Sequence, residues 1–99
     1  MIAKSSKFPM RSGFYAWRKV ATLTHSQHFL IYSHPAPSPR VAFIISSKKI
    51  KLATQRNVLR RTVLDALLPL ARASSRDLVL FLKSKAPTKV LISELLANC

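Results

Sequence analysis

The stretch Asp77 to Lys83, DLVLFLK, constrains the fold of this chain more than any other. Its apolar side chains follow one another without alternation over the length of a strand, which is typical of a central strand buried on both faces. Further strands are predicted at 28–33 and 40–46, and a weaker one at 20–24. Between the two stronger strands the prolines of HPAPSP, residues 34–39, predict a stiff hairpin connection.

Two shorter helices are predicted towards the ends of the chain. The first covers 14–20, because Phe14 and Trp17 recur at helical spacing. The last opens at Pro87 and Thr88, residue types that suit a first helical turn. The side chains expected to form its buried side are Val90, Leu91, Leu95 and Leu96.

A longer helix is predicted between these two, with Thr54 as a residue that can cap its start. Pro69 lacks an amide donor and clashes with the preceding turn, so we expect a kink or an end near Leu68. The order helix, strands, helix, strand, helix favours an α+β fold, an α-β sandwich with a mainly antiparallel sheet. The apolar stripe of the long helix that should face the core consists of Leu59, Val63, Ala66, Leu67 and Leu70.

The charge of the chain is far from balanced. Seventeen lysines and arginines face three acids, a net charge of +14 on 99 residues. Such an excess of positive charge repels itself, and proteins usually carry it only where a polyanion neutralises the charge. Nucleic acid is therefore the first expected partner. With 48% apolar residues the chain is too hydrophobic for a disordered basic tail, and its length suits a single domain over 1–99. Residues 1–11 are expected to form a flexible basic arm.

An anionic membrane surface is the second candidate partner. No apolar run approaches the roughly 20 residues that span a bilayer, and no single helix combines a wide apolar face with a cationic one. We therefore expect no membrane partner. The first twelve residues contain no apolar stretch typical of a cleavable signal, which favours a cytoplasmic location.

A catalytic or metal site is not indicated by any strong pattern. His25, His28 and Cys99 could in principle hold a metal, but three ligands so dispersed more often are polar loop histidines and an ordinary terminus. Cys99 is the only cysteine, which excludes an internal disulfide. The acids are far apart and no Ser/His/Asp arrangement stands out, so we expect no catalytic residue. The three acids are Asp65, Asp77 and Glu94.

Positive charge is concentrated in KKIKLATQRNVLRR, residues 48–61, which holds six cations and no acid. Cations oppose the helix dipole at a helix start, at about 0.3–1 kcal/mol each when exposed, so stability does not explain them. Guanidinium groups and helix-start amides both bind phosphate oxygens, which explains them better. A solvated basic face is the alternative. At four-residue spacing Arg56, Asn57, Arg60 and Arg61 share one arc of the helix, and Lys48, Lys49 and Lys51 extend it along the preceding loop.

RNVLRR, preceded by SSKKIKLAT and the strand RVAFII, resembles the signature of the bacterial ribonuclease P protein subunit. Arg56, Asn57 and Arg61 match its Arg-Asn-Arg-x-Lys-Arg helix start, and Arg60 stands where Lys is usual. Val58 replaces the third member of the triplet, and Leu64 takes a later position that is often basic. The segments 14–32 and RDLVLFLKSKAP extend the resemblance over most of the chain.

The resemblance implies a left-handed βαβ crossover, an exception to the right-handed rule. It implies that the basic residues named above bind the catalytic RNA. It also implies a cleft for the single-stranded 5′ leader of precursor tRNA, although core packing is an alternative for Phe14 and Tyr32. Ser47 is a second alignment for the family serine. The residues that match the leader-binding positions are Phe14, Trp17, Arg18, Tyr32 and Ser46.

The function implied is that of an accessory subunit of an endoribonuclease, in which the RNA subunit cuts precursor tRNA and leaves a mature 5′ end. Magnesium acts with that RNA, and the protein alone is expected to bind no cofactor. The expected partners are ribonuclease P RNA and precursor tRNA, with no obligate protein partner. The alternative is a structural RNA-binding protein of the ribosomal type, which would share the charge but need no leader cleft.

Overall fold

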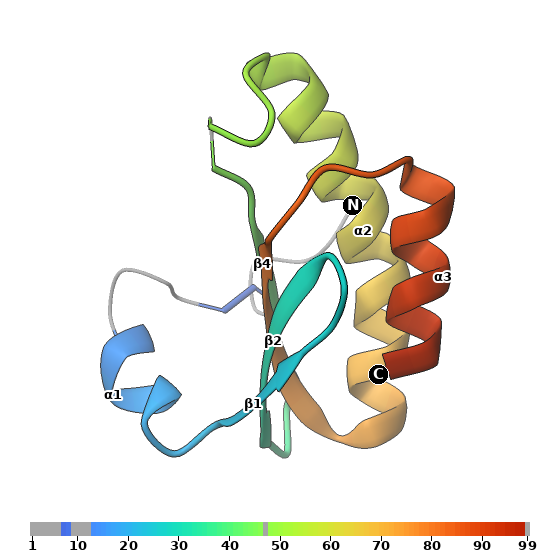
Figure 1. The fold of residues 1–99 in the computed structure, drawn as a ribbon. Coiled ribbons are helices and arrows are strands. Elements are labelled where there is room, and N and C mark those ends of the chain that lie inside the picture. Colours follow the sequence, from blue (N-terminus) through green and yellow to red (C-terminus); the bar gives the residue numbers. More distant parts are fainter. Residues whose placement is uncertain (1–6, 9–12, 47, 99) are drawn as a thin grey trace.

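The computed structural model describes residues 7–8, 13–46 and 48–98, and its elements are labelled in Figure 1. Three helices and four strands form an α+β sandwich around one mixed sheet, which confirms the predicted fold class. Figure 1 shows the sheet edge-on, with the two longer helices on one side and the short first helix on the other. In chain order the elements are α1 (Phe14–Arg18), β1 (Thr22–His25), β2 (Phe29–Pro35), β3 (Val41–Ile44), α2 (Ala53–Ser74), β4 (Arg76–Leu82) and α3 (Thr88–Asn98).

The apolar run DLVLFLK forms β4, and the strand order is β1-β2-β4-β3. β4 pairs antiparallel with β2, where Ile31 is opposite Leu80, and parallel with β3, where Phe43 is opposite the same Leu80. Leu80 and Val79 are both buried although they point to opposite faces of the sheet. The prediction of a central strand buried on both faces is therefore confirmed.

The predicted hairpin between the second and third strands is wrong. β4 lies between β2 and β3, so these two strands do not pair, and the hairpin of the sheet joins β1 to β2 instead. The strand β2 continues into the proline-rich segment, where Pro35 is opposite Arg76. The interior place of β4 suits its apolar run, which is longer than that of β3 and is buried on both faces.

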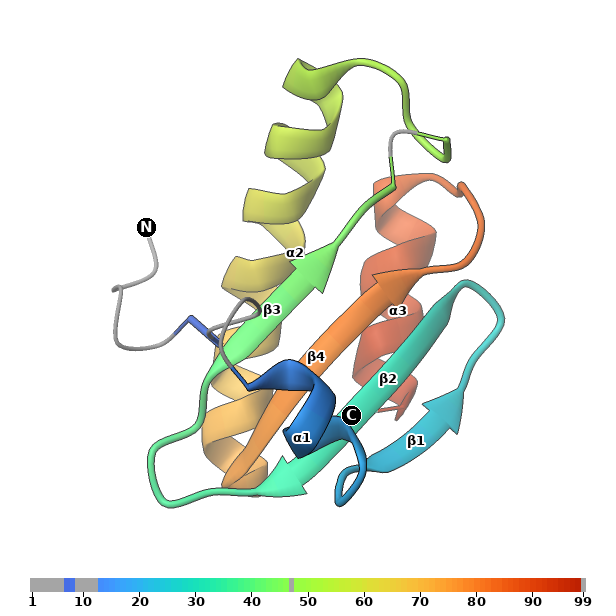
Figure 2. The same cartoon turned by 90° about the vertical axis from the view of Figure 1, so that its left-hand side faces the viewer.

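The connection from β3 through α2 to β4 is a left-handed crossover. Figure 2 shows the sheet face-on with α1 in front of it and α2 behind it, and β4 lies to the right of β3 with the same direction. A crossover that passes behind the sheet while it moves to the right is left-handed, in agreement with the expectation and against the usual rule.

α2 continues through Pro69 to Ser74. The prediction of a kink or an end near Leu68 is therefore wrong where it allows the helix to end there. Pro69 is exposed, whereas its neighbours Leu68 and Ala71 are buried in the main core and hold the helix in place. The helix ends at Ser75, whose left-handed φ of 54° is typical of a residue that follows a helix.

The start of α2 also differs from the prediction. Leu52 is the cap residue, Thr54 lies inside the helix, and no side chain makes a capping hydrogen bond. The stripe is shifted as well: Ala66 and Leu70 are only half-buried. The shift arises because α2 packs against α3 as well as against the sheet. Its buried side chains are Leu59, Val63, Leu64, Leu67, Leu68 and Ala71.

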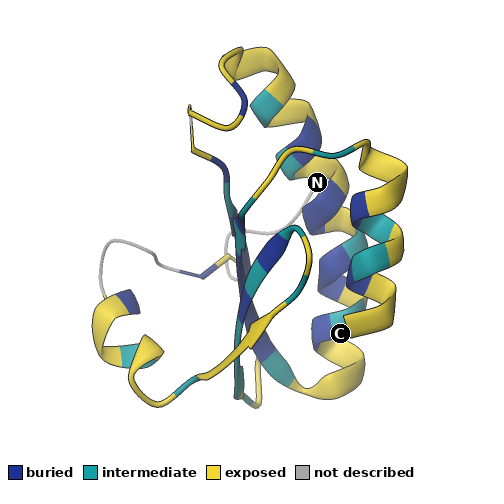
Figure 3. Cartoon of the chain, viewed as in Figure 1, coloured by how far each residue is buried: buried dark blue, intermediate teal, exposed yellow. Residues whose placement is uncertain are grey.

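The main core fills the space between the sheet and the two longer helices, as the buried residues in Figure 3 show. Phe29, Ile31 and Phe43 belong to it, as predicted. α3 contributes less than expected: Leu91 and Leu95 are buried, but Val90 is 45% and Leu96 61% exposed. α3 therefore packs by a narrow side, formed by Leu91 and Leu95 with the half-buried Ile92 beside them.

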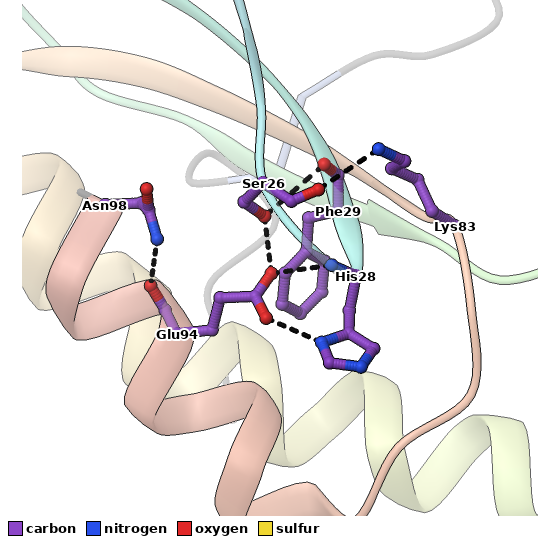
Figure 4. Close-up of polar contacts among 6 residues, drawn as sticks. All are labelled: Ser26, His28, Phe29, Lys83, Glu94 and Asn98. Atoms are coloured by element: carbon purple, nitrogen blue, oxygen red, sulfur yellow. Dashed lines mark hydrogen bonds and ion pairs between the residues drawn. The ribbon is translucent and has the colours of Figure 1, made fainter.

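A carboxylate fixes α3 to the turn between β1 and β2 (Figure 4). The Ser26 hydroxyl and the His28 amide donate hydrogen bonds of 2.5 and 2.8 Å to Glu94 Oε2, and His28 Nδ1 lies 2.6 Å from Oε1. Burial opposes ionisation of this carboxyl, but the hydrogen bonds from Ser26 and His28 outweigh it, so the pKa of Glu94 is lowered from its ordinary 4.5. The contact therefore favours the ionised carboxylate.

Candidate RNA interface

The loop from β3 to α2 presents three lysines to solvent. The amides of Lys49 and Ile50 both donate to the carbonyl of Ser46, and the Ser46 hydroxyl accepts from the amide of Lys48 at 3.1 Å. Ile50 is buried and anchors this turn. Ser46 is thus exposed at the start of the loop, and Ser47, the alternative alignment, lies outside the described residues. The exposed lysines are Lys48, Lys49 and Lys51.

Arg56 fixes this loop to the helix that follows. Its Nη1 donates to the carbonyls of Ile50 and Lys51, both at 2.8 Å, and the side chain is half-buried. A charged donor to two carbonyls holds the loop more firmly than neutral hydrogen bonds would. Arg56 therefore positions the lysines in addition to any contact with a phosphate.

The sequence predicts that Arg60 and Arg61, as charged residues on one arc of the helix, are both exposed. This prediction is wrong for Arg60, which is half-buried. Its Nε donates to the carbonyl of Phe43 at 3.3 Å and its Nη1 to Asn57 Oδ1 at 3.0 Å. The carbonyl is accessible because β3 is an edge strand. Asn57 and Arg61 remain exposed, so the start of the helix presents an exposed guanidinium beside one that is held by the sheet.

We call these seven residues, Lys48, Lys49, Lys51, Arg56, Asn57, Arg60 and Arg61, the basic surface. In the described part of the chain no acid forms an ion pair with it. Asp77 binds Arg40 at 3.1 Å, and Glu94 binds His28. The positive potential of the basic surface is therefore not neutralised from within the fold.

The second set of predicted residues lies on the sheet face opposite α2 and α3. Gly13, whose φ of 137° suits a glycine, precedes α1, and α1 lies across this face. Phe14 is only 6% exposed and packs edge-on against Tyr32 at 5.6 Å between ring centroids. The core alternative therefore holds for Phe14, which supports the surrounding rings and offers no free face.

Trp17 and Tyr32 are half-buried, with ring centroids 6.5 Å apart. Phe81 on β4 lies 5.8 Å from Tyr32 and is half-buried as well. We call Trp17, Tyr32 and Phe81 the aromatic face. Arg18 is exposed at its margin and lies over the ring of Tyr15 at 5.7 Å.

Phe81 was missed by the sequence reasoning. The signal was its spacing of two residues from Val79, which puts both side chains on the same face of β4. An uninterrupted apolar run hides this alternation, because every residue in it reads as core.

The strand β3 connects the two sets. Ala42 and Ile44 pack with the aromatic face, the carbonyl of Phe43 holds Arg60, and Ser46 lies two residues after the end of the strand. A strand of RNA can therefore pass from the aromatic face to the basic surface along one edge of the sheet. Stacking rings next to free cations are the usual surface for single-stranded nucleic acid.

The segment expected to be a flexible basic arm is described only at Lys7 and Phe8. Lys7 forms an isolated parallel bridge with Val41, and Phe8 is buried against Trp17 and below the guanidinium of Arg40. These two residues belong to the fold. The other residues of 1–11 lie outside the described ones.

The described part of the structure does not bring the possible metal ligands together. His28 contacts Glu94, His25 is exposed, and Cys99 lies outside the described residues. Within 7–8, 13–46 and 48–98 no group of three His, Cys, Asp or Glu side chains could hold a metal ion. Over the same residues, no helix has the length and hydrophobicity needed to cross a membrane.

Leu64, one of the two departures from the family motif, is 8% exposed and belongs to the main core. Its apolar side chain is explained by packing. Val58, the other departure, is 62% exposed and is not explained in that way.

Comparisons with known proteins agree with this geometry. The profile of the family described as Ribonuclease P matches residues 2–97. No curated protein sequence matches the chain. Among solved structures, the RNase P protein from Thermotoga maritima in complex with 1-(4-fluorophenyl)-2-thiourea has a TM-score of 0.74 at 18% identity, over 93% of this chain and 95% of that one.

A second similar structure is a Staphylococcus aureus RNase P protein mutant with defective mRNA degradation activity. Its TM-score is 0.77 at 15% identity, over 95% of this chain and 85% of that one. At such low identity the two structures establish the fold alone, whereas the profile covers nearly the whole sequence. The chain therefore belongs to the ribonuclease P family, the protein subunits of the endoribonuclease that matures the 5′ ends of tRNA in partnership with ribonuclease P RNA.

Proposed function

We propose that this chain binds ribonuclease P RNA through the basic surface and the 5′ leader of precursor tRNA through the aromatic face. The RNA subunit then carries the chemistry. This division is supported by the side chains present: cations form the basic surface, and half-buried rings form the aromatic face. Of the three acids, Asp77 and Glu94 are each held by a basic partner, and Asp65 is exposed on α2. Magnesium acts with the RNA subunit, so the protein itself needs no metal site.

The single observation that carries the proposal is the continuity of the two surfaces through β3. A structural RNA-binding protein needs the cations but gains nothing from half-buried rings beside them. A leader strand needs both, since each stacked base contributes about 1–3 kcal/mol and its phosphates need countercharge. The proposal also places the chain in the cytoplasm, where precursor tRNA is processed.

The leader contact is tested by changing Trp17 and Tyr32 to Leu together. Leucine keeps apolar bulk over Phe14 but removes the flat rings. In the holoenzyme reconstituted with its ribonuclease P RNA, we expect binding of precursor tRNA to weaken by about tenfold or more. Binding of mature tRNA, which has no leader, should not change. The measurement is a titration of each labelled tRNA.

Tyr15→Ala is the matched control, because Tyr15 is also an aromatic residue of α1 but is 75% exposed and does not belong to the aromatic face. This variant should bind both tRNAs as the unchanged protein does. Equal losses for precursor and mature tRNA in the double variant would contradict the proposal. They would favour the ribosomal type of RNA-binding protein.

A further inference from the structure

An apolar groove of about 410 Å³ lies beside the basic surface. It is lined by the first turns of α2 and by the loop from β4 to α3, two segments whose course can be followed in Figure 1. Its volume is within the range of small-molecule sites, and its surface is mostly apolar. The lining residues from α2 and the preceding loop are Ile50, Thr54, Gln55, Val58 and Leu59. The facing loop and the first residue of α3 supply Lys85, Ala86, Pro87 and Thr88.

Val58 is the exposed wall of this groove. Ile50 and Leu59 are buried beneath it, at 6% and 8% exposure, whereas Val58 is 62% exposed and adds little to the core. Val58 is also the position at which the chain departs from the Arg-Asn-Arg pattern. Where an arginine would extend over the groove with its charge, valine leaves an apolar wall.

The rim of the groove is polar and cationic. Thr54 and Gln55 offer side-chain hydrogen-bonding groups, and Lys85 lies in the lining. Arg61, three residues after Val58, is its neighbour on the helix surface and is exposed. None of the described residues that line the groove is an acid. Its occupant must therefore combine an apolar body with hydrogen-bonding edges and negative charge on both sides.

We propose that this groove binds one unpaired nucleobase of ribonuclease P RNA. The base lies against Val58 and Leu59, its edge meets Thr54 and Gln55, and the phosphates on either side of it meet Arg61 and Lys85. An unpaired nucleotide has this combination of flat apolar faces, polar edge and flanking charge. The proposal rests on the proposed function, because it names a second kind of contact to the same RNA.

The test compares Val58→Ser with Leu96→Ser in binding to ribonuclease P RNA by the full chain. The two side chains have almost equal exposure, 62% and 61%, but Leu96 lies on α3 and does not line the groove. We expect Val58→Ser to weaken RNA binding by about fivefold or more, the lower end of one stacked base. The slope of log K against log salt should not change, because no phosphate contact is lost. Leu96→Ser should bind as the unchanged protein does.

A second measurement needs no variant. In the protein with labelled Ile, Leu and Val methyl groups, the methyls of Ile50, Val58 and Leu59 should shift upfield on addition of the RNA, because a base ring lies over them. The methyls of Leu96 should not shift.

Tight RNA binding with unshifted groove methyls and no effect of Val58→Ser would overturn the groove proposal and leave the proposed function intact. Absence of RNA binding by the unchanged chain would overturn both. If Val58→Ser instead reduced binding to vesicles of anionic lipid, with RNA affinity unchanged, the groove would belong to a lipid and the nucleobase proposal would fail.

Discussion

At the scale of single residues, the arginines of the basic surface fall into two kinds. Arg56 and Arg60 donate to backbone carbonyls of Ile50, Lys51 and Phe43, so they join the loop, the helix and the edge strand. Arg61 makes no such bond among the described residues and is exposed. Their substitutions should therefore have different consequences.

Arg61→Glu should weaken binding to ribonuclease P RNA by about tenfold or more, because a phosphate contact is replaced by repulsion. Thermal unfolding should be nearly unchanged, since surface substitutions away from packed groups have small effects. The control is Arg72→Glu, the same charge change at an exposed residue in the last turn of the same helix. If Arg72→Glu weakened RNA binding as much, the effect would come from net charge and not from a defined surface.

Glu94→Gln should lower the free energy of unfolding at pH 7 by about 1–3 kcal/mol, because hydrogen bonds from Ser26 and His28 to a carboxylate are weakened. The lowered pKa of Glu94 also sets the pH dependence. A carboxyl with a lower pKa in the folded state stabilises the fold above its ordinary pKa of 4.5, and this contribution is lost as the pH falls through the folded value.

The measurement is urea unfolding between pH 7 and pH 3. The unchanged protein should lose stability below about pH 4.5, and Glu94→Gln should lose less over that interval. Asp65→Asn serves as the control, since Asp65 is an exposed acid on α2. Parallel curves for the unchanged protein and Glu94→Gln would contradict this role of Glu94.

At the scale of elements, α2 contains a proline that removes one backbone hydrogen bond without ending the helix. Pro69 lies inside the helix and is exposed, so no packing is lost when it is replaced. Pro69→Ala should stabilise the protein by about 1–3 kcal/mol, because alanine restores an amide donor and removes a clash. Pro87→Ala, at the residue before α3, should not stabilise the protein, since an amide at the start of a helix has no acceptor within that helix. A lower melting temperature for Pro69→Ala would contradict this account.

Much of the fold could be predicted from local patterns. The run in β4 identified the central strand, and the position of α1 and the start of α3 were predicted within a few residues. The neighbour of β3 could not be predicted, because an apolar run indicates burial but not which strand pairs with it. The course of α2 past Pro69 was missed for a similar reason, since Leu68 and Ala71 are held by tertiary packing.

The residues of the candidate site could be predicted from the sequence better than the contacts that these residues make. The spacing of Arg56, Asn57, Arg60 and Arg61 placed them correctly on one helix start. Their separate roles depend on where the carbonyls of Ile50 and Phe43 lie in space, which no local pattern contains. For the same reason Phe14 could be weighed as core or as site, and only its packing against Tyr32 decided for the core.

At the scale of the whole molecule, the sheet separates stability from binding. One face packs against α2 and α3 to form the main core, and the other supports α1 and the aromatic face (Figures 1 and 3). The edge strand β3 leads from that face to the basic surface. A net charge of +14 opposes the compact state, and a bound RNA neutralises such charge, so the fold is suited to work in a ribonucleoprotein.

The central claim is that this chain supports cleavage of precursor tRNA by an RNA catalyst. Its most direct test is the rate of precursor tRNA cleavage by the cognate ribonuclease P RNA at low magnesium, with and without the full chain. We predict strong stimulation with correct mature 5′ ends, which Arg61→Glu reduces and Arg72→Glu does not. Tight binding to the RNA without any stimulation of cleavage would contradict the claim.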